Sequence, residues 1–441
     1  MSTNEYTVIS PLAGPLDGST RVPGDKSISH RSILFSAMAE GTSRVEGVLD
    51  SDDVRSSIGA VTALGAQVNL ERAVDGSLQG GITGWGAKGP QQPDGPIDCG
   101  NSGTTVRLLM GVLAPWDIKV TLTGDASLVK RPMRRVTLPL MKMGVRFQPE
   151  DRDTLPLTEM GTSNLKPLTY HTPVASAQLK TAILLAGLFA DGTTTVVEPA
   201  PSRNHTELML PEYGVETVAA ERSASVTGPS VLHACEVRVP GDPSSAAFVA
   251  CAAALKPGSQ VQIEDVSLNP ARIGFVRTLE HMGADISVQG TGMSGKERYG
   301  TISISYNAKL NGTEVPGSKI AGLVDEIPVL ALVAAKAHGI TVFRDAGELR
   351  VKESDRMAAM IDGLGKIGVN AWAEGDDFYI EGQPDLRIPE GVQFDSLHDH
   401  RLAMTWAVLG MTANAPVSIK DFEAVTVSFP TFLTQFERLV H

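Results

Sequence analysis

The chain has 441 residues, 42% hydrophobic and 20% charged, a composition that indicates a globular protein large enough for two domains and excludes a disordered one. Its formal net charge of −12 argues against nucleic acid as the main partner, because a phosphate backbone selects basic surfaces. The apolar runs are far shorter than a membrane span and the N-terminus MSTNEYTVIS lacks a targeting pattern, so we expect a cytoplasmic protein that binds no membrane.

Six segments, taken in chain order, each predict a helix rich in small residues, then a turn and a β-branched strand. They span residues 32–48, 105–122, 179–197, 246–263, 327–343 and 401–419. After five of these strands, a second amphipathic helix ends at a glycine that opens another strand. We expect each of these glycines to cap its helix in the left-handed region. They are Gly65, Gly144, Gly214, Gly283 and Gly368.

The period of this repeat is longer than that of solenoid proteins, so six α/β units grouped into globular domains fit better than an open array. Alanine and glycine along the first helices indicate that these helices pack closely inside each domain. With three units per domain, the boundary falls near VPGDPSSAAF (239–248), whose start echoes VPGDKSISHR (22–31). If the first strand completes the second domain, the domains are 22–240 and 1–21 plus 241–441.

Polar residues gather at the opening turns of the predicted helices. For first helices they lie at 24–31, 100–107, 175–180, 325–326 and 398–401, and for second helices at 125–135, 202–207, 269–272 and 350–356. A helix N-terminus favours anions, because it offers unpaired N–H groups and the positive end of the macrodipole. Capping residues and solvated arginines would explain any single cluster equally well. Their recurrence at equivalent positions predicts that the protein surrounds more than one anionic group.

The three cysteines, Cys99, Cys235 and Cys251, share no metal-ligand spacing and cannot form a disulfide framework. We expect each to be a small buried apolar residue. No metal site is predicted.

Six of the polar motifs occur in the order GDKSISHR, GNSGTTVR, KRPM, SAQLK, RVKESDR and DHRLAM. Together they resemble the 5-enolpyruvylshikimate-3-phosphate (EPSP) synthases of the bacterial type often called class II. The resemblance implies an α/β fold of two inside-out domains, each built from three similar β-α-β-α-β-β units and joined by two crossover strands. This architecture agrees with the six units that the repeat predicts independently.

The resemblance also implies an activity, that of a 3-phosphoshikimate 1-carboxyvinyltransferase in the shikimate pathway to chorismate and the aromatic amino acids. Such an enzyme transfers the enolpyruvyl group of phosphoenolpyruvate to the 5-hydroxyl of shikimate 3-phosphate by addition and elimination through a tetrahedral intermediate, releasing phosphate. No cofactor or metal is expected, because lysine and arginine supply the compensating charge. We expect a monomer that glyphosate inhibits, with 22–240 on the shikimate 3-phosphate side and the other domain completing the phosphoenolpyruvate site.

By resemblance, the two substrates share a set of cationic and polar residues. Shikimate 3-phosphate is expected to contact Lys26, Ser27, Arg31, Ser176, Gln178, Arg203, Asp325 and Lys352. Phosphoenolpyruvate is expected to contact Lys26, Asn101, Gly103, Arg131, Gln178, Glu353, Arg356, His400 and Arg401. The planar forks of arginine suit phosphate and carboxylate groups better than a point charge does.

The candidate catalytic residues are Asp325, Glu353 and Lys26. We expect Asp325 to take the proton of the 5-hydroxyl and Glu353 to act at the methylene carbon, with Lys26 as a rival or collaborator for either transfer. For His30, a capping or core role is at least as good an interpretation as catalysis.

Two positions bear on the phosphoenolpyruvate pocket. Val427 stands where many family members have a lysine two residues before a Phe-Pro pair, so either other cations compensate or the affinity for phosphate is lower. Gly103 is a glycine, whereas tolerant members of the family carry alanine, so we expect sensitivity to glyphosate.

Two alternative functions stay open at this point. UDP-N-acetylglucosamine enolpyruvyl transferase uses the same donor, and Cys99 precedes a glycine as in its catalytic loop, but its opening motif resembles GxKNA and not GDKSISHR. A non-enzymatic protein that binds phosphorylated ligands would need the cations without the placed carboxylates.

Overall fold

The computed structural model describes residues 6–440, which form two compact units. Unit 1 comprises Met1–Pro23, Gly241–Gly292 and Arg298–His441, and unit 2 comprises Gly24–Pro240 and Met293–Glu297. Each unit has a hydrophobic core of its own. The predicted domain of 1–21 plus 241–441 includes residues 1–5 and 441, which lie outside the described residues, and the functional division of the chain into two domains stays a prediction.

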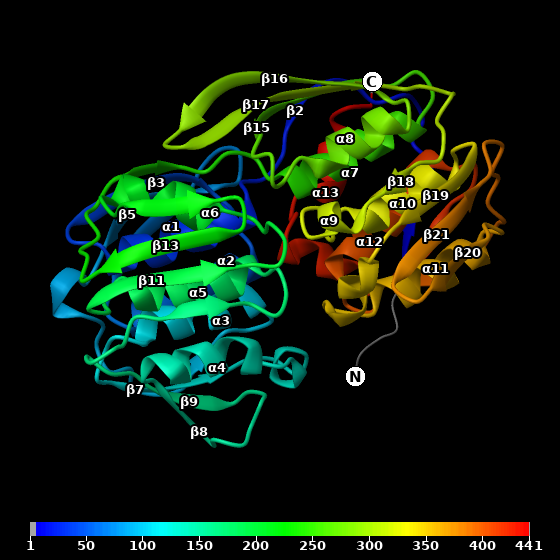
Figure 1. The fold of residues 1–441 in the computed structure, drawn as a ribbon. Helices are drawn as coiled ribbons and strands as arrows, with labels where there is room; N and C mark the ends of the chain where they lie inside the picture. The colour runs from blue at the N-terminus through cyan, green and yellow to red at the C-terminus, as the bar shows by residue number, and fades with distance from the viewer. Residues whose placement is uncertain (1–5, 441) are drawn as a thin grey trace. The chain divides into compact units, whose positions relative to one another are not determined.

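The described part of unit 2 contains three four-stranded sheets (Figure 1). In spatial order, they are β14 (Glu236–Arg238), β3 (Thr42–Val48), β5 (Leu78–Thr83) and β4 (Gln67–Arg72); β6 (Ile97–Asp98), β7 (Lys119–Thr123), β9 (Leu157–Met160) and β8 (Arg146–Gln148); and β10 (Thr169–His171), β11 (Gly192–Val197), β13 (Ser223–Gly228) and β12 (Thr217–Ala220).

The described part of unit 1 contains two four-stranded sheets and one of three strands. In spatial order, they are β16 (Asp285–Ser294), β17 (Glu297–Ser305), β15 (Gln260–Ser267) and β2 (Asp17–Arg21); β18 (Glu314–Val315), β19 (Gly339–Phe343), β21 (Asp377–Gly382) and β20 (Ala371–Glu374); and β1 (Tyr6–Ile9), β23 (Val417–Lys420) and β22 (Gln393–Asp395). The turn of the β16–β17 hairpin groups with unit 2.

All six sheets share one pairing pattern, a parallel outer strand followed by antiparallel strands. In the first sheet, β14 runs parallel to β3, and β5 runs antiparallel to both β3 and β4. The N-terminal segment contributes to two sheets of unit 1, because β2 pairs in parallel with β15 and β1 pairs antiparallel with β23. The same arrangement six times over is what a repeated sequence unit dictates.

The predicted order of helix, turn and strand is confirmed in all six segments, where α1, α3, α5, α7, α10 and α12 lead into β3, β7, β11, β15, β19 and β23. Unit 2 contains α1 (Lys26–Met38), α2 (Asp52–Ala63), α3 (Gly103–Leu113), α4 (Arg134–Met143), α5 (Ala177–Gly187) and α6 (His205–Met209), with 3-10 helices η1 (Gly86–Lys88), η2 (Leu128–Lys130) and η3 (Leu210–Tyr213). Unit 1 contains α7 (Pro243–Leu255), α8 (Gly274–His281), α9 (Gly317–Ile320), α10 (Ile327–Ala335), α11 (Arg356–Lys366), α12 (His400–Thr412) and α13 (Phe432–Glu437), with η4 (Ala346–Val351) and η5 (Phe422–Val427).

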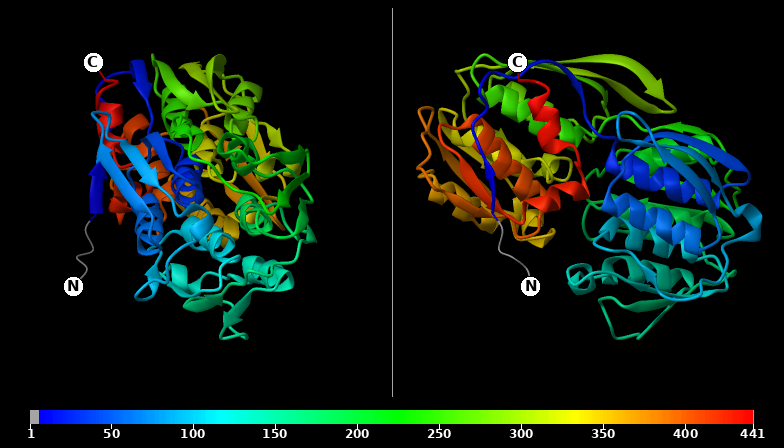
Figure 2. Two further views of the ribbon diagram at one scale, coloured as in Figure 1. Left: turned by 90° about the vertical axis from the view of Figure 1, so that its left-hand side faces the viewer. Right: turned by 180° about the vertical axis from the view of Figure 1, so that it is seen from behind.

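The first helix of each repeat lies inside its unit. Every residue of α7, α10 and α12 is buried, and in α1 only Lys26 and Ser27 are not. A helix that is apolar on all sides belongs in the interior, with the strands outside it (Figures 1 and 2). Each unit is therefore an inside-out α/β fold. Within residues 6–440, no helix has the length and apolarity needed to cross a bilayer.

The predicted glycine caps are confirmed. Gly65, Gly144, Gly214, Gly283 and Gly368 have φ values of +96°, +115°, +82°, +86° and +82°. These values lie in the left-handed region, where a side chain is disfavoured.

The repeated Val-Pro-Gly-Asp sequence serves the fold. Asp25 caps α1 by accepting a hydrogen bond from the backbone N–H of Ile28 at 2.9 Å, and Asp242 caps α7 by accepting from Ser244 at 2.7 Å. A Cβ at Gly24 would overlap a neighbouring backbone carbonyl. The second copy keeps this glycine and aspartate but lacks the lysine and arginine of the first, so those two cations are not needed to start the helix.

Glu159 on β9 carries a carboxyl group that is buried away from water. Its side chain is 1% exposed, and neither oxygen has a hydrogen-bond partner among the described residues. Burial raises its pKa well above the usual value of 4.5, so the folded protein holds this proton at a pH where the unfolded chain has released it. The free energy of unfolding therefore falls as the pH rises from about 4.5 through the raised pKa.

We predict that Glu159→Gln raises the stability of the protein at about pH 7.5, by about 1–3 kcal/mol, and that the gain shrinks toward about pH 5. Thermal melts of the variant and the wild type across this range measure the effect. The control is Glu150→Gln, which removes an exposed carboxylate and should change neither the melting temperature nor its pH dependence. A parallel pH dependence for Glu159→Gln and the wild type would contradict the prediction.

Candidate active site

The first turn of α1 carries the earliest of the predicted ligands, in unit 2. The ammonium of Lys26 contacts the carboxylate of Asp53 in the first turn of α2, and the two side chains are 16% and 9% exposed. Ser27 is half-buried beside it. The carboxylate of Asp53 thus holds the Lys26 ammonium at the opening of the helix.

Arg31, one turn further along α1, is buried and held by hydroxyl groups. Its Nε donates to Thr206 Oγ1 at 2.8 Å, its Nη2 to Thr181 Oγ1 at 2.7 Å and its Nη1 to the carbonyl of Ser27 at 2.9 Å. Thr206 lies in α6, three residues after Arg203. The structure therefore ties Arg31 to the first turn of α6, and Arg203, another predicted ligand of shikimate 3-phosphate, lies two residues before this helix.

His30 belongs to a buried chain of hydroxyl groups. Its Nδ1 lies 2.8 Å from Ser57 Oγ, which lies 2.8 Å from Thr105 Oγ1, and Thr105 contacts Ser102 Oγ at 2.8 Å. Burial, helped by the neighbouring cations, lowers the pKa of His30 well below 6.5, so the ring is neutral. These contacts fit a core histidine that joins the starts of α1, α2 and α3.

The start of α3 gathers three predicted ligands of phosphoenolpyruvate. Arg131 Nη2 donates to Asn101 Oδ1 at 2.8 Å, and Asn101 Nδ2 donates to Asp125 Oδ2 at 2.6 Å. Gly103 is the first residue of the helix, and a Cβ there would lie 2.9 Å from Arg107 Nη1 and 3.4 Å from Arg131 Nη1. The missing side chain at Gly103 thus lets two guanidinium groups approach the helix start.

Gln178 belongs to the same cluster. Its Oε1 accepts from Arg107 Nη1 at 2.9 Å, and its Nε2 donates to Thr104 Oγ1 at 2.9 Å. Ser176 caps α5, because its hydroxyl accepts from the N–H of Leu179 at 3.4 Å. The starts of α3 and α5 are therefore joined by side chains.

A buried ion-pair cluster supports the start of α5. Lys180 Nζ lies 2.9 Å from Glu198 Oε2 and 2.8 Å from Glu207 Oε1, and Glu198 also accepts from the N–H of Ser176 at 3.0 Å. All three charged side chains are buried. Lys180, from the SAQLK motif, thus has a structural role in fixing Ser176.

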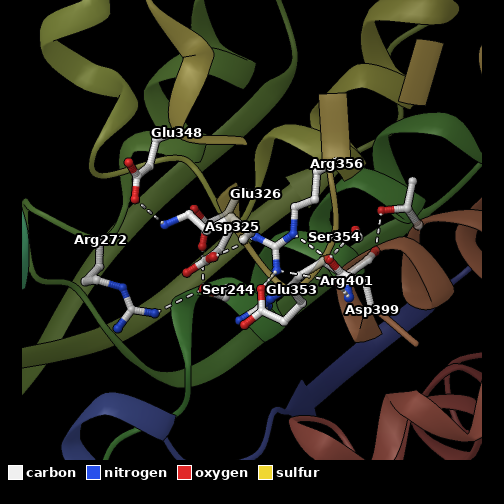
Figure 3. Close-up of polar contacts among 12 residues, drawn as sticks. Ser244, Arg272, Asp325, Glu326, Glu348, Glu353, Ser354, Arg356, Asp399 and Arg401 are labelled. Atoms are coloured by element: carbon white, nitrogen blue, oxygen red, sulfur yellow. Dashed lines mark hydrogen bonds and ion pairs between the residues drawn. The ribbon is translucent and has the colours of Figure 1, made fainter. Parts of the chain in front are cut away.

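In unit 1, the predicted acid–base residues meet on one arginine (Figure 3). Arg356 Nη1 lies 3.0 Å from Asp325 Oδ1, and its Nη2 lies 2.7 Å from Glu353 Oε2. Its Nε donates to Asp399 Oδ2 at 2.9 Å, and its Nη2 also contacts Asp399 Oδ1 at 3.3 Å. Asp325 and Glu353 are thus brought to opposite arms of one guanidinium.

The charge of Arg356 is set by its carboxylate partners. Burial opposes its charge, but Asp399, Glu353 and Asp325 outweigh burial and raise its pKa, so the guanidinium stays charged. Asp399 is fully buried, and it also caps α12 by accepting from the N–H of Arg401 at 2.9 Å. One aspartate therefore ties Arg356 to the start of the next internal helix.

A second set of contacts lies behind Asp325. The hydroxyl of Ser244 contacts the carboxylate of Glu326, the residue that follows Asp325, and Arg272 Nη2 donates to Ser244 Oγ at 3.1 Å (Figure 3). Arg272 Nη2 also donates to Asp242 Oδ1 at 2.8 Å. These contacts explain the polar cluster at 269–272, together with the boundary segment 239–248, as a buried support for the start of α10.

Arg401 differs from Arg356. Its side chain is 5% exposed and lies over the ring of Phe248, with 6.0 Å between the guanidinium carbon and the ring centroid. Among the described residues, neither its Nε nor its Nη1 has a hydrogen-bond partner. A buried guanidinium with unsatisfied donors is costly unless an anion binds it.

The other predicted residues of unit 1 lie close by in sequence. Lys352 Nζ lies 3.3 Å from Glu348 Oε1, and His400 is buried at the start of α12. Val427 is half-buried at the end of η5. Six of the predicted residues thus belong to unit 1, namely Asp325, Lys352, Glu353, Arg356, His400 and Arg401, and the rest belong to unit 2.

Four site residues were missed by sequence reasoning. They are Asp53, Arg107, Asp125 and Asp399. Three of them lie inside the polar clusters at 100–107, 125–135 and 398–401, so their position at helix starts was a usable signal. For Asp53, at the start of a second helix, only an Asp-Asp pair after a serine pointed to a helix start.

Within residues 6–440, no group of three or more histidine, cysteine or acidic side chains is arranged to hold a metal ion. The positive charges beside the carboxylates of the site come from lysine and arginine side chains.

Comparison with solved structures places the fold. The chain superimposes on an EPSP synthase structure from Acinetobacter baumannii with a TM-score of 0.86, 40% identity and 98% coverage of each chain. The enolpyruvyl transferase NikO from Streptomyces tendae, 17% identical, shares the fold with a TM-score of 0.76 over 99% of this chain and 98% of that one. The fold is therefore that of the enolpyruvyl transferases.

The sequence comparisons narrow the class to a family. A family model described as "EPSP synthase (3-phosphoshikimate 1-carboxyvinyltransferase)" matches residues 12–436. A 3-phosphoshikimate 1-carboxyvinyltransferase from Paramagnetospirillum magneticum is 46% identical over 96% of this chain and 95% of its own, and one from Roseobacter denitrificans is 44% identical over 96% and 94%. The chain belongs to the EPSP synthase family, and its activity is carboxyvinyl transfer in the shikimate pathway.

The predicted fold, family and activity are confirmed, and the alternative of UDP-N-acetylglucosamine enolpyruvyl transferase is not supported. Cys99 also argues against that alternative, because it is fully buried and burial, with the nearby Asp98, raises its pKa to about 12. A buried thiol of this kind is not a nucleophile. Cys251 is buried as expected, but the expectation was wrong for Cys235, which is only partly buried at the edge of the unit 2 core.

We predict that Asp399→Asn lowers kcat about tenfold or more, because Arg356 loses its most buried carboxylate and Asp325 and Glu353 lose their common anchor. Asparagine still caps a helix, so the effect of charge is separated from that of capping. Steady-state phosphate release and a thermal melt measure activity and folding.

The matched control is Asp355→Asn, at the N-cap of α11, where the carboxylate accepts from the N–H of Ala358 at 2.9 Å and pairs with Arg350 at 3.6 Å. Its kcat should match that of the wild type. A folded Asp399→Asn protein with the wild-type kcat would overturn the prediction.

Proposed function

We propose that the carboxyvinyl transfer is carried by the residues that the family motifs mark. Unit 2 supplies Lys26, Ser27, Arg31, Ser176, Gln178 and Arg203 to shikimate 3-phosphate and Lys26, Asn101, Gly103, Arg131 and Gln178 to phosphoenolpyruvate. Unit 1 supplies Asp325 and Lys352 to the first substrate and Glu353, Arg356, His400 and Arg401 to the second. The cytoplasmic location, the monomeric state and the inhibition by glyphosate belong to the same proposal.

The observation that carries the phosphoenolpyruvate assignment is the buried Arg401, two of whose nitrogens have no hydrogen-bond partner among residues 6–440. A buried arginine with unsatisfied donors at a helix start is suited to bind a phosphate or carboxylate group. Folding has already removed water from its guanidinium, so binding the anion adds no further desolvation cost for this group. Arg131, 2.8 Å from Asn101, and the bare helix start at Gly103 offer further donors to the same substrate. These contacts support the proposal that arginine forks and backbone replace a metal as the source of positive charge.

The observation that supports the acid–base assignment is the shared contact with Arg356. Asp325 and Glu353 contact separate nitrogens of one guanidinium, so each carboxylate has a defined position and a charged partner. Asp325 accepts the proton of the 5-hydroxyl as this oxygen attacks the donor. Protonation of the methylene carbon and removal of a proton in the elimination step fall to Glu353 and Lys26. The carboxylates therefore act as proton carriers while Arg356 keeps them in place.

We predict that Asp325→Asn lowers kcat about 10²- to 10⁴-fold while leaving the affinity for shikimate 3-phosphate within about threefold of the wild type. The amide keeps a hydrogen-bonding group next to the 5-hydroxyl but cannot accept its proton. Phosphate release gives kcat, and isothermal titration with shikimate 3-phosphate gives the affinity.

The control is Asp362→Asn, on the exposed side of α11, where the carboxylate pairs with Lys366 at 2.8 Å. This variant should keep the wild-type kcat. Undiminished turnover in Asp325→Asn would remove Asp325 from the mechanism.

We predict that Gly103→Ala raises the glyphosate concentration needed for half-inhibition about tenfold or more, with a smaller rise in KM for phosphoenolpyruvate. The new methyl group would lie 2.9 Å from Arg107 Nη1, so this flexible guanidinium must move and the pocket at the start of α3 becomes smaller. Steady-state inhibition at several phosphoenolpyruvate concentrations measures both effects.

The control is Gly59→Ala in α2, where an added Cβ has no neighbour within 4 Å. It should leave inhibition unchanged. Equal inhibition of Gly103→Ala and the wild type would show that glyphosate does not bind against the start of α3.

A further inference from the structure

The turn of the β16–β17 hairpin has no role in the mechanism proposed above. The strands of this hairpin continue the sheet of β15 and β2, which belongs to unit 1 (Figure 1). Residues Met293–Glu297 at the turn nevertheless belong to unit 2. A hairpin turn usually lies in solvent and varies freely, so its attachment to unit 2 calls for a physical reason.

Three contacts attach the turn within unit 2. Ser294 Oγ donates to the carbonyl of Arg238 at 2.6 Å. The carboxylate of Glu212 accepts from the backbone N–H of Lys296, and a Cβ at Gly295 would overlap this carboxylate. The third contact is the closest, because Glu297 Oε1 lies 2.5 Å from His205 Nδ1. The turn is therefore anchored by side chains on both sides of its glycine.

The pair of Glu297 and His205 is buried on both sides. The side chain of Glu297 is 3% exposed and that of His205 is 0% exposed. A buried carboxylate needs a hydrogen-bond donor to compensate for its lost hydration, and a carboxylate oxygen can only accept, so the pair requires the imidazole tautomer with its hydrogen on Nδ1. The contact also fixes the orientation of the ring, so His205 has one position in the fold.

His205 is the first residue of α6. Arg203, a predicted contact of shikimate 3-phosphate, lies two residues before it. Thr206, the next residue, accepts from Arg31 Nε at 2.8 Å. Glu207 contacts Lys180 at 2.8 Å, and Lys180 is part of the cluster that holds Ser176. Fixing His205 therefore fixes the backbone from which Arg203 and Thr206 extend.

We propose that Glu297 is a positioning residue for shikimate 3-phosphate, which acts through His205 on Arg203 and Arg31. It does not touch the substrate. It holds the start of α6 so that the two guanidinium groups meet the phosphate and carboxylate of this substrate in a preset geometry. The inference rests on the proposed function, in which Arg31 and Arg203 bind shikimate 3-phosphate.

A positioning role makes a specific prediction about the two substrates. Loss of the Glu297 carboxylate leaves the His205 N–H without its acceptor and loosens the start of α6, and a shift of about 1 Å in a positioning group is enough to weaken binding strongly. The affinity for shikimate 3-phosphate should fall, whereas the phosphoenolpyruvate contacts at Arg131 and Arg401 have no link to α6 in the contacts described above. We therefore expect Glu297→Ala to raise the dissociation constant and the KM of shikimate 3-phosphate about 5- to 20-fold and to change the KM of phosphoenolpyruvate less than about twofold.

The experiment compares the full-length wild type with Glu297→Ala, Glu297→Gln, Arg203→Ala and the double variant of Glu297→Ala with Arg203→Ala. Isothermal titration with shikimate 3-phosphate gives the affinity, and phosphate release gives both KM values. Glu297→Gln keeps an acceptor for Nδ1–H and should restore at least half of the lost binding free energy. In the double variant, the loss should be clearly smaller than the product of the two single losses, because both act through Arg203. The matched control is Lys296→Ala, which removes an exposed side chain next to Glu297 but keeps the backbone N–H used by Glu212.

The outcomes distinguish a failure of the proposed residue assignment from a failure of the inference about Glu297. An unchanged affinity in Arg203→Ala overturns the residue assignment in the proposed function and with it this inference. A weakened Arg203→Ala together with a Glu297→Ala of wild-type affinity overturns only the inference. Equal rises in both KM values for a folded Glu297→Ala protein indicate general loosening and also overturn it. If Glu297→Ala does not fold, as judged by its thermal melt, Glu297→Gln decides. A rise of about 1.5- to 4-fold confined to shikimate 3-phosphate supports the inference, and a wild-type affinity overturns it.

Discussion

The first helix of every repeat is buried, and this burial governs where polar residues must stand. Helices α7 and α12 are enclosed along their whole length, so their unpaired N-terminal N–H groups need partners inside the protein. Asp242 and Asp399 supply such partners as caps, and Asp25 does the same for α1, whereas α10 begins without a side-chain cap. Polar residues at most of these helix starts therefore serve the fold, and the catalytic chemistry is built onto places where polar groups were needed in any case.

The two buried arginines of unit 1 show how one residue type serves two purposes. Arg356 is enclosed by Asp325, Glu353 and Asp399, so its charge is satisfied and it acts as a scaffold for two proton-transfer groups. Arg401 lies on the neighbouring helix start with unsatisfied donors among the described residues. The difference does not come from burial, which is nearly the same for both, but from the carboxylates around them. A satisfied arginine holds other residues in place, whereas an unsatisfied one is suited to bind an anion.

Local patterns in the sequence predicted much of the fold and part of the site. The six repeats, the glycine caps and the polar helix starts follow from spacings of a few residues, and such spacings reflect helix and strand geometry directly. The site residues that were missed have partners far away along the chain. Asp399 is 43 residues away from Arg356, and Arg107 is 71 residues away from Gln178. The partial exposure of Cys235 was missed for the same reason, because the edge of a core is defined by elements distant in sequence.

The repeat, the position of each helix start and, through the ordered motifs, the family and its reaction can be read from the linear chain. These features depend on the local order of apolar, small and polar residues, which the sequence contains in full. The pairing of carboxylates with cations, the sharing of one guanidinium by Asp325 and Glu353, and the contact of the turn at Met293–Glu297 with the start of α6 are visible only in the folded protein. Side-chain partners are set by the packing of helices and sheets, and this packing minimises the exposed apolar surface of a whole unit rather than of any segment.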